Sequence, residues 1–247
     1  MNKEILKYQK DCFAHYLKTM REQIPEFPKK YIYPDGNPVR PVLPVQITPN
    51  KIMLIGAFPS ARFERRDGVL IPIADNLSPF GEEKYFDGRE IRIQESRESL
   101  NRYYFPQLDI KNEDLWITDI VKVYLFPEKH IKNCEIIAPK IKFYNTHKMF
   151  KKIAKASLNW IIKEIEICNP KLIITLGEIP ARVISSDYKS ENVKLLDGSI
   201  REVKFNKVYK ISHLAHPEIR RRNKEWDDRT KIFIHKLSKV VKVLNYN

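Results

Sequence analysis

Short apolar runs recur along the chain and are separated by longer segments of mixed polarity. Four of these runs are rich in β-branched residues, which is typical of strands buried in a parallel sheet. The four runs cover residues 51–56, 114–126, 170–177 and 207–212. The first and the third end in glycine, at Gly56 and Gly177.

Apolar residues spaced three or four positions apart predict helices around these strands. The helical stretches run from residue 5 to 24, from 150 to 165 and from 226 to 244. Strands that alternate with helices are the signature of α/β domains. We therefore predict a three-layer αβα fold around a central four-stranded parallel sheet.

The segment that follows the first helical stretch is rich in proline. Seven prolines lie between Pro25 and Pro49, a density that excludes a helix. We expect residues 1–50 to form an N-terminal helix and a proline-rich arm that packs on the domain. Residues 51–247 are expected to form the α/β domain, so that the whole chain is one globular unit.

Ligand sites in open α/β sheets lie at the carboxyl ends of the strands, where the connecting loops gather. This rule directs attention to four segments of the chain. They are GAFPSARF (56–63), DIVKVYLFPEKH (119–130), GEIPAR (177–182) and HLAHPEIRRR (213–222).

Composition narrows the function further. Lysine and arginine outnumber acidic residues, 45 to 31, and the formal charge of +14 favours a polyanionic partner such as nucleic acid. The three cysteines share no CxxC spacing, so neither a zinc knuckle nor a disulfide framework is indicated. No apolar run approaches the roughly 20 residues that span a bilayer, and the first residues lack the apolar core of a signal peptide. We expect a cytoplasmic monomer with no membrane partner and no metal.

Several of these segments, in this order, resemble motifs of the uracil-DNA glycosylase superfamily. Gly56 to Pro59 resembles its strand-Gly-x-x-Pro turn, and His216 with Pro217 resembles its His-Pro loop. The segment LWITDIVKV is similar to the strand that presents a base-reading Asn, and NPKLIITLGEIPARV is similar to a further apolar motif. DNLSPFGEE, which contains Phe80, is similar to the loop that supplies a stacking aromatic. The resemblance covers roughly residues 51–222.

The resemblance implies a cofactor-free enzyme that flips uracil or another deaminated base out of DNA and hydrolyses its N-glycosidic bond. His216 would donate a hydrogen bond to the base O2 and stabilise the negative charge that departs with the base. Phe80 would stack on the base and Asp119 would read its edge. The expected base-pocket residues are Gly56, Ala57, Phe58, Phe80 and Asp119, and the expected DNA contacts are Ser60, Arg62, Pro217, Ile219, Arg220 and Arg221.

The first motif departs from the family pattern. Between its Gly and Pro the family carries an acid or amide that positions the attacking water, whereas this chain has Ala57 and Phe58. Either another carboxylate substitutes, or leaving-group stabilisation alone drives cleavage, or the protein binds without cleaving. Asp75 is the candidate for a substitute catalytic group, and the alternative is that it caps a turn with Asn76.

A second departure is Asp119, where the family most often has Asn. An amide both donates and accepts hydrogen bonds, whereas an ionised carboxylate only accepts. An ionised Asp119 would disfavour uracil and favour a base edge that offers donors. Alternatively, Asp119 only caps the end of its strand.

Two groups of arginines flank the motifs. They are Arg62, Arg65 and Arg66 after the first turn, and Arg220, Arg221 and Arg222 after the His-Pro loop. We expect both groups on one face, where they would contact phosphates, with Ile219 wedged into the gap left by the flipped base. The alternative is that the second group pairs with Glu225, Asp227 and Asp228.

The alternative function is a catalytically silent nucleic-acid-binding protein on the same fold. The missing acid or amide in the first motif favours this alternative, whereas His216 and Phe80 favour an enzyme because a plain binder needs neither. A nucleotide-binding module is disfavoured, since the chain has only seven glycines and neither a GxGxxG nor a P-loop pattern.

Overall fold

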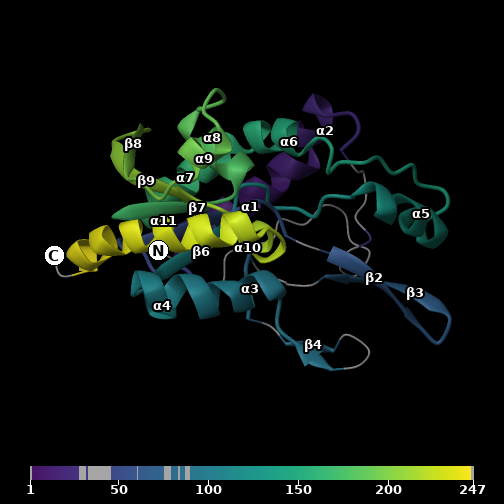
Figure 1. The fold of residues 1–247 in the computed structure, drawn as a ribbon. Coiled ribbons are helices and arrows are strands. Elements are labelled where there is room, and N and C mark those ends of the chain that lie inside the picture. Colours follow the sequence, from purple (N-terminus) through teal and green to yellow (C-terminus); the bar gives the residue numbers. More distant parts are fainter. Residues whose placement is uncertain are drawn as a thin grey trace.

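A computed structural model describes residues 2–27, 32, 46–59, 61–74, 79–82, 84–86 and 90–245. Its centre is a five-stranded sheet (Figure 1). In spatial order the strands are β6 (Leu115–Asp119), β1 (Ile52–Gly56), β7 (Leu172–Leu176), β9 (Val208–Leu214) and β8 (Arg201–Lys204).

The four predicted strands are confirmed, and they are parallel to one another. The fifth strand, β8, is antiparallel to β9 and was not predicted. Its residues alternate between half-buried and exposed, so it lacks the continuous apolar run that marks the other four. The apolar run 114–126 is a strand only as far as Asp119, and its remaining residues are buried outside the strand.

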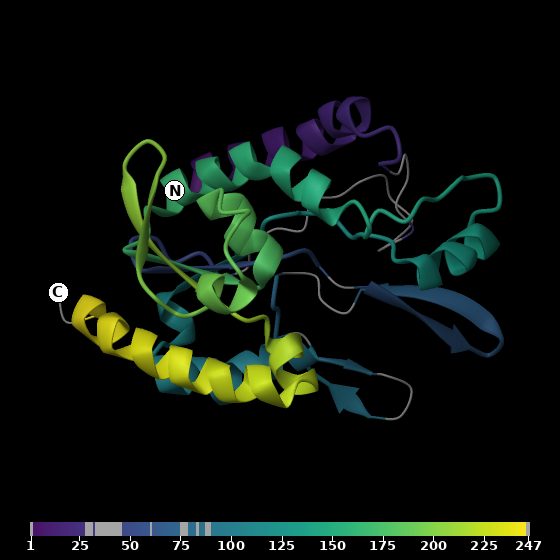
Figure 2. The same cartoon turned by 45° about the horizontal axis from the view of Figure 1, so that its top comes forward.

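Both faces of the sheet are buried, because successive side chains of a strand point to opposite sides. Met53 and Ile55 of β1 belong to one apolar core, and Ile52 and Leu54 belong to the other. Helices α1 (Asn2–Leu17), α2 (Thr19–Gln23), α6 (Phe150–Ala156), α7 (Leu158–Cys168) and α8 (Glu178–Ser185) contribute to the first core. The second is covered by the π-helical turn η1 (Leu100–Tyr104), α4 (Phe105–Leu108) and α11 (Lys224–Asn245). The three layers are evident in Figure 2 and confirm the αβα fold.

The helices differ from the predicted stretches in two places. Residues 5–24 were predicted as one helical stretch but belong to α1 and α2, which are separated at Lys18. Residues 150–165 were predicted to form one helix but belong to α6 and α7, which meet at Ser157. The Ser157 hydroxyl donates to the Ile153 carbonyl at 2.9 Å and also bonds Tyr16 at 2.7 Å. Such bonding of a serine to the preceding turn bends helices. None of the described helices is long and apolar enough to cross a membrane.

A β-hairpin and a helix project together from one end of the sheet (Figures 1 and 2). The hairpin pairs β2 (Ala61–Arg66) with β3 (Val69–Ala74), and α5 (Glu128–Ile137) lies against β2. Asp67 and Gly68 have φ values of 49° and 78°, as a two-residue type I′ turn requires. The Asp-Gly pair between two apolar segments was the sequence signal for this hairpin, which was not predicted.

The other described elements connect these layers. They are β4 (Tyr85–Phe86), β5 (Ile91–Arg92), α3 (Glu95–Ser99), η2 (Asn112–Asp114), α9 (Asn192–Leu195) and α10 (Pro217–Arg222). Most of the predicted proline-rich arm lies outside the described residues.

Candidate active site

The carboxyl ends of the parallel strands bring the predicted site residues to one edge of the sheet. Gly56 ends β1 and lies opposite Asp119, the last residue of β6, in the strand register. Gly177 follows β7, and its amide donates to the Leu214 carbonyl of β9 at 2.8 Å. His216 comes two residues after β9 and caps α10.

Gly56 allows this edge to close tightly. A Cβ atom at this position would overlap both the Asp119 Oδ1 atom and the ring of Phe80. The ring of Phe80 in turn lies 5.9 Å from the ring of His216, at an interplanar angle of 39°. Gly56 thus lies next to Asp119 and Phe80, and Phe80 lies next to His216, so the four residues are neighbours at this edge of the sheet.

The backbone of Phe80 is held in an unusual conformation. Its φ of 46° lies in the left-handed region, which a bulky residue seldom occupies and which recurs at functional sites. The Phe80 side chain is only 5% exposed. A strained, buried aromatic at this position is consistent with a fixed stacking surface.

Arg97 supports the loop that carries Phe80, and no sequence motif pointed to this residue. The side chain is fully buried and donates to the Phe80 carbonyl at 3.2 Å. It also donates to Glu82 and to Asn112, both at 2.7 Å. Because buried guanidinium groups need several acceptors, Arg97 ties the Phe80 loop to η2.

His216 is held as a neutral hydrogen-bond donor. Its Nδ1 accepts a hydrogen bond from the Glu218 amide at 3.2 Å, as the N-cap of α10. The proton of a neutral ring is therefore on Nε2. Burial lowers the pKa of His216 to about 4, so the ring is uncharged near neutral pH.

The loop before His216 is fixed from two sides. The hydroxyl of Tyr104, in the π-helical turn, donates to the Ala215 carbonyl at 2.9 Å. Gly177 has a φ of 98°, and a Cβ atom there would lie 3.4 Å from the Cβ of His216. π-Helical turns often occur at functional sites, and here the turn places a tyrosine under the His-Pro loop.

Asp119 is a buried carboxyl group at the floor of the site. It is 3% exposed, and burial raises its pKa to about 7, against a smaller lowering by Lys122. No described Lys or Arg forms an ion pair with this carboxyl group. The sequence analysis treated Asp119 as ionised. This buried environment instead favours the protonated form at pH values below about 7.

A buried ion pair lies next to Asp119 and was not anticipated. Lys122 and Glu164 are both fully buried, and their charged groups are 2.5 Å apart. Lys122 Nζ also donates to the Asp119 carbonyl at 2.9 Å. Glu164 accepts further hydrogen bonds from Trp116 at 2.8 Å and from Tyr8 at 3.1 Å. The N-terminal helix α1 is thus connected to the floor of the site.

The two residues at the position of the family's acid or amide differ in their surroundings. The Ala57 carbonyl accepts from the Val121 amide at 3.0 Å. The ring of Phe58 packs edge-on against Phe150 and His147, with centroid distances of 4.9 and 5.3 Å. Phe58 therefore contributes to packing between β1 and α6. Asp75 and Ser60, the predicted catalytic acid and phosphate contact, lie outside the described residues.

The comparison with known families decides the assignment. A sequence model described as Uracil DNA glycosylase superfamily matches residues 45–239. The chain belongs to the uracil DNA glycosylase superfamily. A search of curated proteins found no match. The superfamily match includes every predicted site residue and leaves α1 outside.

The arginines that follow the His-Pro loop of this superfamily member are already paired. Arg220 is 8% exposed, forms an ion pair with Asp227 at 2.6 Å and lies 3.7 Å above the centre of the Tyr103 ring. Arg221 pairs with Glu95 at 2.7 Å, and Arg222 pairs with Glu218 at 3.0 Å. The alternative of structural ion pairs therefore holds for Arg220, with Asp227 as its predicted partner.

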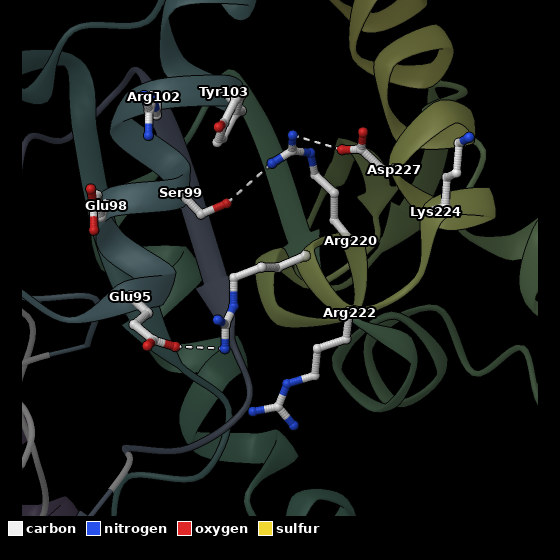
Figure 3. A pocket seen from close by; sticks show the side chains of 10 residues that line it. Glu95, Glu98, Ser99, Arg102, Tyr103, Arg220, Arg222, Lys224 and Asp227 are labelled. Atoms are coloured by element: carbon white, nitrogen blue, oxygen red, sulfur yellow. Dashed lines mark hydrogen bonds and ion pairs between the residues drawn. The ribbon is translucent and has the colours of Figure 1, made fainter.

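A pocket of about 650 Å³ lies between α3 and the start of α11 (Figure 3). Arg220 points into it toward Ser99, Tyr103 and Asp227, whereas Arg222 points away from these groups. Glu95, Arg102 and Arg221 also line the pocket, but the four residues around the base site do not. Its lining carries both acidic and basic side chains, and the pocket is separate from the residues around His216.

The first group of arginines lies elsewhere in the glycosylase-like fold. Arg62, Arg65 and Arg66 are on strand β2 of the projecting hairpin, which both views show extending away from α10. Arg62 and Arg66 both contact Glu64, at 2.9 Å. The first group of arginines is therefore on the projecting hairpin, and the second group is on α10 beside α11.

The described residues contain no group of three side chains suited to hold a metal ion. His213, which could have formed a pair with His216, is fully buried in β9 and bonds Thr175 through Nδ1 at 2.7 Å. His213 is therefore a buried residue of the sheet that pairs with a neighbouring strand.

Proposed function

We propose that the protein is a DNA glycosylase that extrudes uracil or another deaminated base and hydrolyses its N-glycosidic bond. The observation that carries this proposal is that Gly56, Phe80, Asp119 and His216 are neighbours at the carboxyl edge of the sheet. These residues come from four segments that are far apart in the sequence. Membership of the superfamily, established over residues 45–239, supports the same chemistry.

In the proposed reaction His216 stabilises the leaving base. Cleavage of an N-glycosidic bond develops positive charge on the sugar and negative charge on the base. A neutral Nε2–H donor directed at the base O2 stabilises that negative charge, as a donor in an oxyanion hole does. Phe80 stacks on the base once it has left the duplex.

The attacking water needs a further group. Ala57 and Phe58 have no side chain that can orient a water molecule, so another residue must do so or the leaving group must carry most of the catalysis. Asp75 is our candidate for that residue. Its replacement by Asn is expected to slow base release, if the Asp75 carboxylate positions the water.

DNA is the proposed partner, bound by the face around α10. Ile219, at the start of this helix, is 40% exposed and is our candidate for the residue that fills the gap in the duplex. Arg221 and Arg222 have partly exposed side chains, and surface ion pairs such as theirs are weak enough to be exchanged for phosphates. The formal charge of +14 supports this choice of partner.

A catalytically silent DNA-binding protein is the second candidate function. The apolar pair Ala57 and Phe58 favours it, since the family's acid or amide is missing there. It predicts binding to DNA that depends on salt concentration but no base release.

Base release from synthetic oligonucleotides separates the two candidates. Single- and double-stranded oligonucleotides carrying uracil, hypoxanthine or xanthine are incubated with the protein and then treated with alkali, which cleaves abasic sites. We expect strand scission with wild type and a loss of about 10²–10³ in rate for His216→Ala. His235→Ala, at an exposed position on α11, is the matched control and should keep full activity. Scission with none of the substrates, while DNA binding persists, would establish the silent binder.

A further inference from the structure

The two sides of β6 carry different charges. Side chains alternate along the strand, so Trp116 and Thr118 point toward α7 while Ile117 points toward the opposite core. Asp119 follows the same alternation and contacts the Gly56 and Phe80 side. Glu164 of α7 accepts from Thr118 at 3.1 Å. The Asp119 carboxyl group and the Glu164 carboxylate are therefore on opposite faces of the sheet.

Lys122 is the described cation that acts on both carboxyl groups, and its charge is already matched by Glu164. Its ammonium group contacts Glu164 Oε2 at 2.5 Å, and it reaches Asp119 only through the backbone carbonyl at 2.9 Å. It also donates to the Thr118 hydroxyl. One buried lysine thus neutralises one of two buried carboxyl groups, and the Asp119 side chain has no ion-pair partner among the residues that the structure describes.

We propose that Asp119 reads the flipped base as a neutral carboxylic acid, kept uncharged because Glu164 neutralises Lys122. A carboxylic acid donates through its O–H and accepts through its C=O. It therefore offers the same pair of hydrogen bonds as the Asn that the family most often has here. This inference rests on the proposed function, since it concerns the base that the glycosylase would bind.

The substrate class that fits this acid is a base with a lactam edge, in which a ring N–H adjoins a carbonyl. The acid O–H would donate to the carbonyl oxygen and the acid C=O would accept from the N–H. Uracil, hypoxanthine and xanthine all have this edge. A lactam base is also a good leaving group, because its carbonyl oxygens share the departing negative charge. That property suits a site with Ala57 and Phe58 in place of the family's acid or amide.

The inference makes base release depend on pH. In the part of the chain that the structure describes, the charged and titratable groups around Asp119 are Lys122 and Glu164 behind it and His216 across Phe80. Burial raises the pKa of Asp119 to about 7 and lowers the pKa of His216 to about 4. Between these values both groups are neutral. Above pH 7 Asp119 loses its O–H proton, and its two carboxylate oxygens then repel the carbonyl oxygen of a lactam base.

The test is the rate of uracil release under single-turnover conditions from pH 5 to 9. We expect the wild-type rate to fall about tenfold per pH unit above pH 7, as for a single titrating group, and the Asp119→Asn rate to stay level. Glu164→Gln leaves Lys122 unneutralised, so the ammonium group should favour an ionised Asp119. We expect the midpoint of the fall to drop by at least about one pH unit in that variant.

An infrared measurement tests the protonation of Asp119 without relying on activity. The C=O band of a protonated carboxylic acid should be present at pH 6 in wild type and absent in Asp119→Asn. Absence of this band in wild type, a level wild-type pH profile, or an unmoved midpoint in Glu164→Gln would overturn the inference. Faster release of cytosine than of uracil at pH 6 would overturn the lactam assignment. If the band is present but no base is released at any pH, the proposed function fails and the protonation of Asp119 stands.

Discussion

At the scale of single residues, the site depends on close contacts that other side chains would break. The backbone φ of Gly56 is one that any residue can adopt. A glycine is needed here because a side chain would overlap Asp119 and Phe80. The sequence indicated Gly56, Phe80, Asp119 and His216 through their motifs. It could not indicate that Lys122 is paired with Glu164 instead of Asp119, because Glu164 is 45 positions away from Asp119 in the chain.

Replacing Gly56 by Ala should therefore damage the pocket. The added methyl group would displace the Phe80 ring or the Asp119 carboxyl group, and we expect base release to slow by at least about tenfold, since misplacing a catalytic group by 1 Å can cost 10²-fold. Gly68→Ala is the control, because a Cβ there meets nothing within 4 Å. Its positive φ should cost only about 1 kcal/mol in stability, with no effect on activity. Equal activity of the two variants in the base-release assay would argue against a pocket at Gly56.

Asp119 should also make the stability of the protein depend on pH. Burial raises its pKa from 3.8 to about 7, so the folded state holds a proton that the unfolded state has lost. The contribution of Asp119 to stability is fully present below about pH 4 and is lost as the pH rises through 7. At about 1.4 kcal/mol per pH unit, the loss is about 4 kcal/mol at most. Asp119→Asn should therefore gain stability relative to wild type between pH 5 and pH 8, as measured by urea unfolding. A constant difference between the two proteins across this range would show that Asp119 does not titrate there.

At the scale of elements, the loops of the site are held by contacts between segments that the sequence does not relate. Arg97 of α3 anchors the Phe80 carbonyl, and Tyr104 of the π-helical turn anchors the carbonyl of Ala215. Periodicity predicted the strands and the long helices because these bury regular apolar patterns. It could not predict the π-helical turn or the break at Ser157, which depend on individual hydrogen bonds between distant segments.

Removing the Arg97 side chain should loosen the Phe80 loop. In Arg97→Met the partners Glu82 and Asn112 and the Phe80 carbonyl lose their common donor, and we expect a loss of about 2–4 kcal/mol in the free energy of unfolding. Arg229→Ala removes an exposed pair with Glu225 and should cost no more than about 0.5 kcal/mol. Urea unfolding measures both variants. A similar small loss in the two would mean that Arg97 does not hold the loop.

The arginines of α10 should differ in their roles: Arg220 should stabilise the fold, and Arg222 should contact DNA. Arg222→Ala should weaken DNA binding and reduce the slope of log K against log salt by about 1, with stability unchanged. Arg220→Ala should instead lower stability by about 1–3 kcal/mol, because Asp227 and Tyr103 lose a buried partner. Fluorescence anisotropy at several salt concentrations and urea unfolding measure the two effects. If Arg222→Ala leaves the salt dependence of wild type intact, α10 does not contact phosphate.

At the scale of the whole molecule, the N-terminal helix α1 shares an apolar core with the superfamily domain. Tyr8 and Tyr16 of α1 bond Glu164 and Ser157 of the first core, although α1 lies outside the matched range 45–239. The sequence predicted a helix packed on the domain but not its polar link to the floor of the site. The sequence also did not indicate that the first group of arginines would lie on a projecting β-hairpin.

The most direct test of the central claim is a crystal structure of the protein with DNA that contains an abasic product and free uracil. We expect the uracil ring to stack on Phe80, with its O2 about 2.7–3.2 Å from His216 Nε2 and its N3–H and O4 facing the Asp119 carboxyl group. Arg222 should contact a phosphate next to the abasic site. Uracil bound instead in the pocket lined by Arg220 and Glu95, with nothing against Phe80, would contradict the proposed base site.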